Sequence, residues 1–493
     1  MLNIDTYRYL KTFLLIVLSS IIGLFSVLVG YINEGVFGKG IIIILLSCIN
    51  GSILLLYMRQ RLKKTADIMD FGFIFSGFFI VYNVFLLLNV GVSFSQQGLV
   101  KTQYPISFEA DIYIKASLLV FLACSGLLVG ETIFKQSNEK RYEIEKILFN
   151  SGNNVYYVSG VLLFVIGIIL LFFDYNRIGG FFYALKLDRG VRMDLLSQSR
   201  GNLPYSSFIF TGLALIAFSL RRLSIKSFKS IILMVLLAAW CTLLIIQGDR
   251  RFLLYSFLIF FTIYFYGKKI NIKRVLFSLI LLYVLFSVFQ QVRYMIPLIL
   301  NSEASISDLV NKVRKDFNIE WLLPVSNEAA GPYFTLLWHL KFGFSTLYGY
   351  SYVMSIPNIL PRSLYPGEKP LTIAQDFANY IHDVYYPFRS SIIGWGFSPI
   401  AEAYVNFGVA GVFIVFLLLS LLFRKISEIK HRANGYWIMI VGSLMPQAFN
   451  LNRINFSSVV QESVINLFIL FFSVFFIHIV LNNRFYKKKR RIT

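Results

Sequence analysis

Clusters of Lys and Arg recur at every second connection between long apolar runs, and this alternation restricts the chain to a membrane fold. The basic connections are 59–64, 135–146, 221–229, 268–274, 424–432 and 484–491. Because short basic loops of membrane proteins stay on the cytoplasmic side, an even number of spans must separate each cluster from the next. The chain is 57% hydrophobic and only 15% charged, which is too little charge for a soluble protein of this length.

Apolar runs near or above the roughly 18 residues needed to cross a bilayer predict about twelve transmembrane helices. They cover 12–32, 40–58, 71–91, 112–130, 154–173, 204–220, 230–247, 252–267, 275–292, 403–423, 435–450 and 463–482. We therefore expect an all-α polytopic protein, with residues 1–493 forming a single integral membrane domain. Both termini should be cytoplasmic, because the basic connections put them on the same side.

The net charge of +22 follows largely from this topology and does not indicate a nucleic-acid partner. The cysteines Cys48, Cys124 and Cys241 all lie in apolar runs and have no metal-ligand spacing. We find no Walker loop, dinucleotide fingerprint or nucleophile elbow in the sequence. The sequence therefore predicts no cofactor and no bound metal, and it argues against an ATP-driven pump.

Two of the connections predicted to be external are long. The first, 174–203, contains Arg189 and Arg192, although basic residues normally stay inside. The second, 293–400, is long enough to be functional in its own right. Helical spacing predicts helices near 307–317 (lying in the membrane interface), 327–342 and 374–384.

Between the apolar runs 231–246 and 252–266 lies the turn Gly248-Asp249-Arg250-Arg251. The basic clusters on both sides put this turn on the external face, where positive charge is unusual. One interpretation is structural, with Asp249 capping the next helix and the arginines reaching the lipid headgroups. The functional interpretation is an anion site, because a helix N-terminus and two guanidinium groups both suit phosphate.

Further candidates lie in and after the long connection. Arg362 and Arg389 occupy polar, proline-containing strips. Glu402 stands at the mouth of the next span, and a carboxylate at membrane depth is costly and usually functional. We expect it to face the external cavity and either to act as a base or to orient Arg389. A structural ion pair with a neighbouring arginine is the alternative.

The architecture, the turn at 248–251 and the segment Ser398-Pro399-Ile400-Ala401-Glu402-Ala403-Tyr404-Val405-Asn406-Phe407-Gly408 together resemble the bacterial O-antigen polymerases (Wzy), or oligosaccharide repeat-unit polymerases. The resemblance covers most of the chain and implies a helical glycosyltransferase fold shared with the O-antigen ligases. Arg250 and Arg251 match the family pattern, and Arg362 and Arg389 match it more loosely.

The resemblance implies polymerisation of undecaprenyl-diphosphate-linked oligosaccharides outside the bacterial cytoplasmic membrane. Donor and acceptor would both be lipid-linked, and a chain-length regulator protein is a further candidate partner. Arg250, Arg251 and Glu402 would be catalytic. Asp249, Arg189, Arg192, Arg362 and Arg389 would bind substrate.

The same residues support such a reaction chemically. Fixed guanidinium groups stabilise the charge that develops on a departing diphosphate, so no metal is required. A carboxylate can accept the proton of the acceptor hydroxyl, and direct attack inverts the anomeric carbon.

Two alternatives remain open. The first is a lipid-linked oligosaccharide flippase or other transporter, which should carry charges inside several spans, whereas these spans are nearly all apolar at mid-depth. The second is an O-antigen ligase, which uses the same donor with a different acceptor. No aligned counterpart of the catalytic His of the ligases is found in this sequence.

Overall fold

The structure is a computed structural model. It describes residues 35–98, 104–133, 153–187, 189–198, 203–220, 228–266, 284, 287–288, 295–316, 330–360, 365, 368–388, 392–430 and 436–489. Within these residues every regular element is a helix and no strand occurs, which confirms the all-α prediction.

Seven helical segments in the described part are long and apolar enough to cross a membrane. They are α2 (Val36–Thr65), the continuous run α3 (Phe71–Phe79), η1 (Ile80–Phe85) and α4 (Leu86–Gln97), then α5 (Ala110–Ile133), α6 (Asn153–Asn176), α10 (Phe228–Ile246), α19 (Pro399–Lys430) and α22 (Phe456–Lys489). A shorter apolar helix, α9, covers Tyr205–Leu220. This arrangement is that of a multi-pass membrane protein.

The other predicted spans differ in their outcomes. The span predicted at 12–32 lies outside the described residues, and the one at 275–292 lies almost wholly outside them. The run at 252–267 forms α11 (Arg250–Tyr264), which has 15 residues. The run at 435–450 is divided into α20 (Tyr436–Leu444) and α21 (Pro446–Asn450), because Pro446 has no N–H for the helix ladder and occupies the start of α21. The count of about twelve spans stays a prediction.

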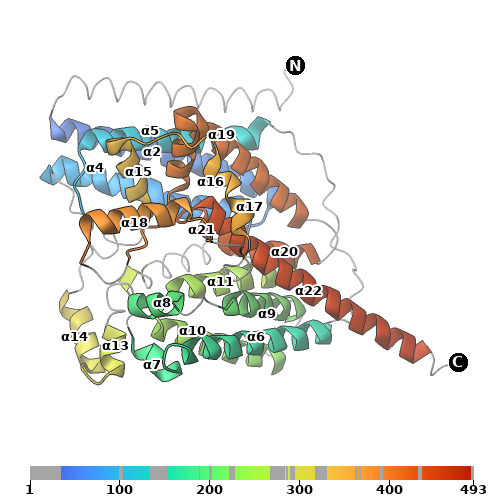
Figure 1. Ribbon diagram of the computed structural model, residues 1–493. Helices are drawn as coiled ribbons and strands as arrows, with labels where there is room; N and C mark the ends of the chain where they lie inside the picture. Colours follow the sequence, from blue (N-terminus) through green and yellow to red (C-terminus); the bar gives the residue numbers. More distant parts are fainter. Residues whose placement is uncertain are drawn as a thin grey trace, which may run out of the picture.

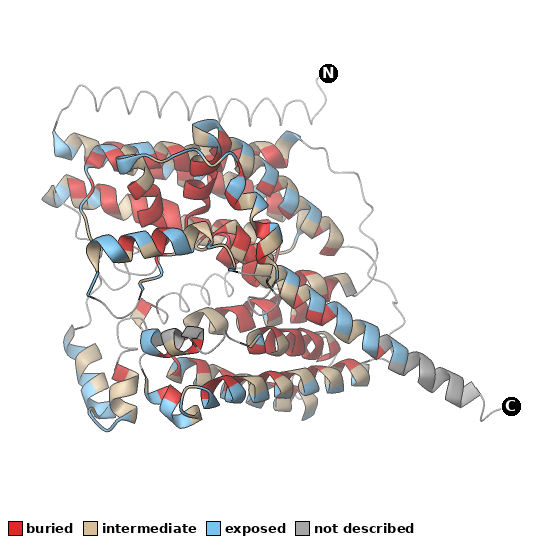
Figure 2. Ribbon diagram, in the orientation of Figure 1, coloured by how far each residue is buried: buried red, intermediate tan, exposed pale blue. Residues whose placement is uncertain are grey.

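The helices form two groups (Figure 1). In the first group α2 packs on α4 and α5, and α19 packs on α5 and α3. In the second group α9 packs on α6 and α11, and α10 packs on α11. The buried residues gather within the groups (Figure 2).

The C-terminal helices connect the two groups. Helix α20 contacts α11 and α9 on one side and α19 on the other, while α21 lies between α3 and α11. Helix α22 contacts both α9 and α6. The segment from α20 to α22 is therefore placed where residues from both groups can meet.

Small residues allow close helix contacts in both groups. On α6, a Cβ added at Gly160 would lie 2.8 Å from the carbonyl oxygen of Gly212 on α9. On α5, a Cβ at Gly126 would lie 2.5 Å from the carbonyl oxygen of Phe413 on α19. Because lipid supplies no hydrophobic force between helices, such close packing is a main source of their association.

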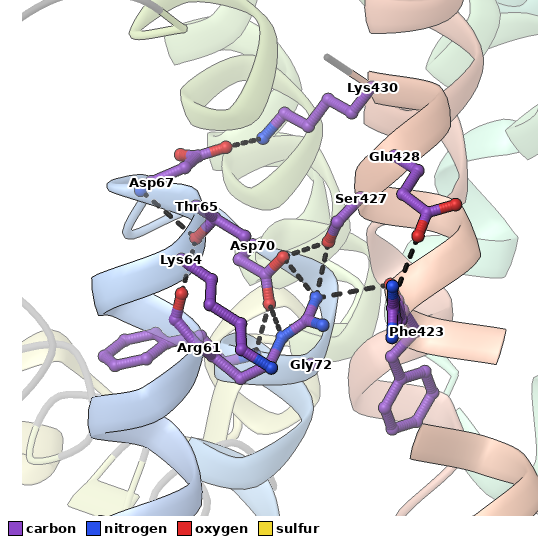
Figure 3. Close-up of polar contacts among 12 residues, drawn as sticks. Arg61, Lys64, Thr65, Asp67, Asp70, Gly72, Phe423, Ser427, Glu428 and Lys430 are labelled. Atoms are coloured by element: carbon purple, nitrogen blue, oxygen red, sulfur yellow. Dashed lines mark hydrogen bonds and ion pairs between the residues drawn. The ribbon is translucent and has the colours of Figure 1, made fainter. Parts of the chain in front are cut away.

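A buried ionic cluster ties α2, α3, α5 and α19 together. Figure 3 shows its contacts among α2, α3 and α19. Arg61, at the end of α2, is 2% exposed and lies 2.6 Å from Asp70 Oδ2 and 3.0 Å from Glu131 Oε2. Its Nη2 also donates to Ser427 Oγ on α19 at 2.6 Å. The segment 59–64, which we expected to be a connection, is therefore the last part of α2.

Two lysines complete the cluster. Lys64 lies 2.7 Å from Glu131, and Lys430 at the end of α19 lies 2.6 Å from Asp67. The three cations (Arg61, Lys64 and Lys430) thus face three carboxylates (Asp67, Asp70 and Glu131). A buried charge is tolerated when it is paired and hydrogen-bonded in this way.

The described residues of the region 293–400 form six helices. These are α13 (Met295–Leu300), α14 (Ile306–Asp316), α15 (Ala330–Phe342), α16 (Tyr350–Val353), α17 (Ser355–Asn358) and α18 (Ile373–Tyr385). The three helices predicted in this region correspond to α14, α15 and α18. Helix α15 is mostly buried and packs on α5 and α19, so this region contributes to the core.

Candidate functional site

The turn between α10 and α11 forms the centre of the candidate site. Helix α10 ends at Ile246, Gly248 takes a left-handed conformation with φ of 71°, and α11 begins at Arg250. Asp249 occupies the N-cap position and is 5% exposed, but its side chain makes no capping hydrogen bond. The turn therefore lies where the sequence predicts it, without the predicted Asp cap.

Arg192 holds this turn from a neighbouring segment. It lies on α8 (Arg189–Gln198) and is 2% exposed. Its guanidinium donates to the backbone oxygen of Gln247 and, at 3.2 Å, to that of Ala184 on α7 (Phe181–Lys186). The same group lies 5.9 Å from the ring centroid of Tyr175. These contacts hold the backbone of the turn, and substrate binding by Arg192 stays a prediction.

Arg251 is half-buried in the first turn of α11, next to Arg250, which is also half-buried. Its guanidinium lies 5.0 Å from the ring centroid of Phe252. Its buried Nε has no hydrogen-bond partner among the described residues. The groups that act on it electrostatically include Tyr255, Asp249 and Glu462. A guanidinium held in this way can still accept an anion.

A polar cluster on α21 and α22 completes the site. The Tyr255 hydroxyl on α11 donates to Asn450 Oδ1 on α21. Asn450 Nδ2 in turn donates to Glu462 Oε2 on α22 at 2.8 Å and to Gln447 Oε1 at 3.0 Å. The site therefore combines α11 from one helix group with the C-terminal helices that connect both groups.

Our sequence interpretation did not include this second half of the site. The signal was the segment 447–455, in which a Gln, three Asn and an Arg follow directly on an apolar helix. In the predicted topology, residues 451–462 are only the connection between the spans at 435–450 and 463–482. This segment could be recognised as part of the site only from the fold, which places Asn450 against Tyr255, 195 residues earlier in the chain.

Glu402 lies inside the protein. Its side chain is 2% exposed, and both carboxylate oxygens are occupied. Oε1 accepts from Ser351 Oγ on α16 at 2.8 Å, and Oε2 accepts from the Phe456 N–H at the start of α22 at 2.7 Å. Asn406, one turn later, donates to Ser351 Oγ at 2.7 Å. The predicted exposure of Glu402 to an external cavity is therefore wrong, because the carboxylate holds two separate elements together.

The segment before α19 supports the same region. Phe397 N–H donates to the backbone oxygen of Arg453 at 2.9 Å. Gly396 has a φ of 76°, and a Cβ at this position would lie 2.3 Å from that oxygen. Only glycine permits this approach, so the Gly-rich strip before α19 positions the connection between α21 and α22.

The remaining predicted site residues are not placed. Arg362 and Arg389 lie outside the described residues, and Arg189 is described only as the first residue of α8. In the part of the chain that the structure describes, no three His, Cys, Asp or Glu side chains are arranged to hold a metal ion. The described cluster offers guanidinium, amide, hydroxyl and carboxylate groups, which together suit an anionic ligand that carries hydroxyls.

Comparison with known proteins gives two matches. The profile of a family described as O-antigen polysaccharide polymerase Wzy matches residues 15–489, nearly the whole chain. Protein CapE of Staphylococcus aureus is 26% identical over 441 residues, which cover 85% of this chain and 87% of that protein. No solved structure matches the chain significantly.

Proposed function

The chain belongs to the Wzy O-antigen polysaccharide polymerase family, and from that premise we propose that it joins undecaprenyl-diphosphate-linked oligosaccharide repeat units into an O-antigen or capsule-type polysaccharide. Donor and acceptor are both lipid-linked, and the reaction takes place on the external face of the bacterial cytoplasmic membrane. The observation that carries the proposal is a polar cluster one turn after Arg251 on α11. There Tyr255 contacts Asn450, which donates to Glu462, so helices from distant parts of the chain meet.

In the proposed reaction Arg250 and Arg251 bind the diphosphate of the donor. As the anomeric bond breaks, negative charge grows on the bridging oxygen, and fixed guanidinium groups stabilise that charge more than the ground state. The arginines supply the positive charge, so the mechanism is metal-independent, and a single displacement inverts the anomeric carbon. Arg192 holds the turn through its contact with Gln247. Together with Asp249, Arg189, Arg362 and Arg389, it is proposed to bind the lipid-linked substrate.

The function is tested by removing the gene and analysing the surface glycan on a gel. A single repeat unit in place of the polymer is the expected result. Loss of the attachment between the glycan and its surface acceptor would indicate a ligase instead. Intracellular accumulation of lipid-linked units would indicate a flippase. A normal polymer ladder would exclude the proposed function.

Glu402 is proposed to act either as the base or as a residue that orients Arg389, and the hydrogen bonds to both of its oxygens argue against the role of base. Glu402→Gln should lower the polymerisation rate only a few-fold and the free energy of unfolding by about 1–3 kcal/mol, because a charged acceptor of two buried donors is lost. Rates with purified protein and unfolding in detergent measure both quantities. Ser351→Ala, which removes one of those donors, should give a similar but smaller pattern. A loss of about a hundredfold at unchanged stability would instead make Glu402 the base.

The proposed topology places both termini inside and 293–400 outside. Glu303 is exposed and lies between α13 and α14, so Glu303→Cys reports on this region. In a background without Cys48, Cys124 and Cys241, it should react with a membrane-impermeant thiol reagent in intact spheroplasts. Labelling only after lysis would refute the proposed orientation.

A further inference from the structure

Glu462 is a carboxylate that is anchored on one side and available on the other. Its Oε2 accepts from Asn450 Nδ2 at 2.8 Å and from Gln447 Nε2 at 3.4 Å. Its Oε1 has no hydrogen-bond partner among the described residues, and the side chain is half-buried. The amides that anchor it are buried, with Asn450 0% and Gln447 2% exposed. One oxygen is thus held by a fixed support while the other stays open.

The position of Glu462 connects it to the proposed diphosphate site. Asn450, which donates to Glu462, also accepts from the Tyr255 hydroxyl of α11, so both sides of the cluster share the same amide. Tyr255 follows Arg251 by one turn of α11. The hydrogen bonds thus connect Glu462 to the helix that carries the proposed diphosphate site.

Glu402 provides the contrast. Both of its oxygens accept hydrogen bonds from the protein, so neither is open to a substrate hydroxyl. Phe456, which Glu402 holds, lies six residues before Glu462 on the same helix, or about 9 Å along its axis. Glu402 therefore fixes the start of the helix that carries Glu462.

We propose that Glu462 is the general base of the polymerisation, with Asn450 as the residue that positions it; this assignment rests on the proposed polymerase function. Glu462 Oε1 takes the proton of the acceptor sugar hydroxyl. The hydroxyl oxygen forms the new bond to the anomeric carbon of the donor. The bond from that carbon to the diphosphate breaks, and its electron pair leaves with the lipid diphosphate, which Arg251 stabilises. The proton on Glu462 is then lost to water.

The first test uses the purified full-length chain in lipid nanodiscs with authentic lipid-linked repeat units. Glu462→Gln keeps the size and much of the hydrogen bonding of the side chain but cannot accept a proton. It should lose at least about a hundredfold in kcat, while the KM for the donor stays within a few-fold of wild type. The exposed Glu303→Gln serves as the matched control and should be normal in rate.

The pH profile separates a base from a structural group. A base accepts a proton only in its deprotonated form, so the wild-type rate should fall at acid pH. The residual rate of Glu462→Gln should lack that acid limb. An acid limb retained in Glu462→Gln, or a rate within a few-fold of wild type, would overturn the proposal.

The role of Asn450 is tested by combining variants. Asn450→Ala should lower kcat less than Glu462→Gln does, and the double variant should be no slower than Glu462→Gln alone, because Asn450 acts through Glu462. If the loss of kcat in the double variant equals the product of the two single losses, Asn450 does not act through Glu462 and its positioning role is overturned.

Folding and overall function are controlled separately. Glu462→Asp keeps a carboxylate and should retain part of the rate; misfolding of both this variant and Glu462→Gln would assign Glu462 to structure and overturn the proposal. If the wild-type chain makes no polymer from authentic repeat units, the polymerase function fails, and the role of Glu462 fails with it. If the wild type makes polymer and Glu462→Gln has a normal kcat, only the assignment of Glu462 as the general base is rejected.

Discussion

Replacing Arg251 by Ala should abolish polymer while leaving the amount of membrane-inserted protein unchanged. The guanidinium lies against Phe252, and its Nε has no hydrogen-bond partner in the described part of the chain. One turn later on α11, Tyr255 contacts the polar cluster of Asn450 and Glu462. Losing a preorganised group that stabilises a departing diphosphate should lower kcat by about 10²–10³. Arg251→Lys should recover only part of the rate, because an ammonium lacks the fork-shaped pair of donors.

The control for this prediction is another arginine near the end of a helix. Arg59, near the end of α2, is exposed. Arg59→Ala should change chain length and rate little, since an exposed charge contributes little. Gel analysis of the polymer from membranes with matched protein levels measures both variants. Polymer of wild-type length from the double variant Arg250→Ala, Arg251→Ala would contradict the proposed diphosphate site.

Replacing Arg61 by Ala should destabilise the protein more than any other single change in the first helix group. Arg61 neutralises Asp70 and Glu131, which are 1% and 0% exposed, so its removal leaves two buried carboxylates with less compensation. Breaking a buried ion pair from one side costs about 3–5 kcal/mol. Unfolding of detergent-solubilised protein by a denaturing detergent measures the change in the free energy of unfolding.

The matched control for Arg61 lies on the same helix group but at the surface. Lys425 on α19 is 73% exposed and contacts Glu428 at 2.9 Å. Lys425→Ala should change the free energy of unfolding by no more than about 0.5 kcal/mol. Equal effects of Lys425→Ala and Arg61→Ala would show that the buried cluster contributes nothing beyond surface electrostatics.

Several parts of the fold followed from sequence patterns that act locally. Apolar runs of membrane length predicted the segments of α2, α5, α6, α10, α19 and α22, because a backbone in lipid must satisfy its hydrogen bonds within the helix. The turn at Gly248 was predicted from the break between two such runs. The family resemblance was visible from the same architecture and the segment 398–408, and the family match over residues 15–489 confirms it.

Local patterns could not predict the distant partners of polar residues. Arg61 was interpreted as part of a basic connection, since nothing nearby in the sequence shows that Glu131 and Ser427 would surround it. Glu402 was expected to face a cavity, but Ser351 and Phe456 enclose it from 51 and 54 residues away. Nothing near Arg192 in the sequence shows that its guanidinium would donate to the backbone oxygen of Gln247, 55 residues later.

The sequence by itself determined where apolar segments become helices, where they are interrupted and which family the chain resembles, because these depend on residue order along one segment. Only the tertiary structure decided which polar side chains have their oxygens paired with donors of the protein and which keep an oxygen available to a substrate. Glu402 and Glu462 are both carboxylates at the ends of apolar runs, and no local sequence pattern shows which of them is the better candidate for the general base. Only packing gives Glu402 two donors and leaves one oxygen of Glu462 without a partner among the described residues.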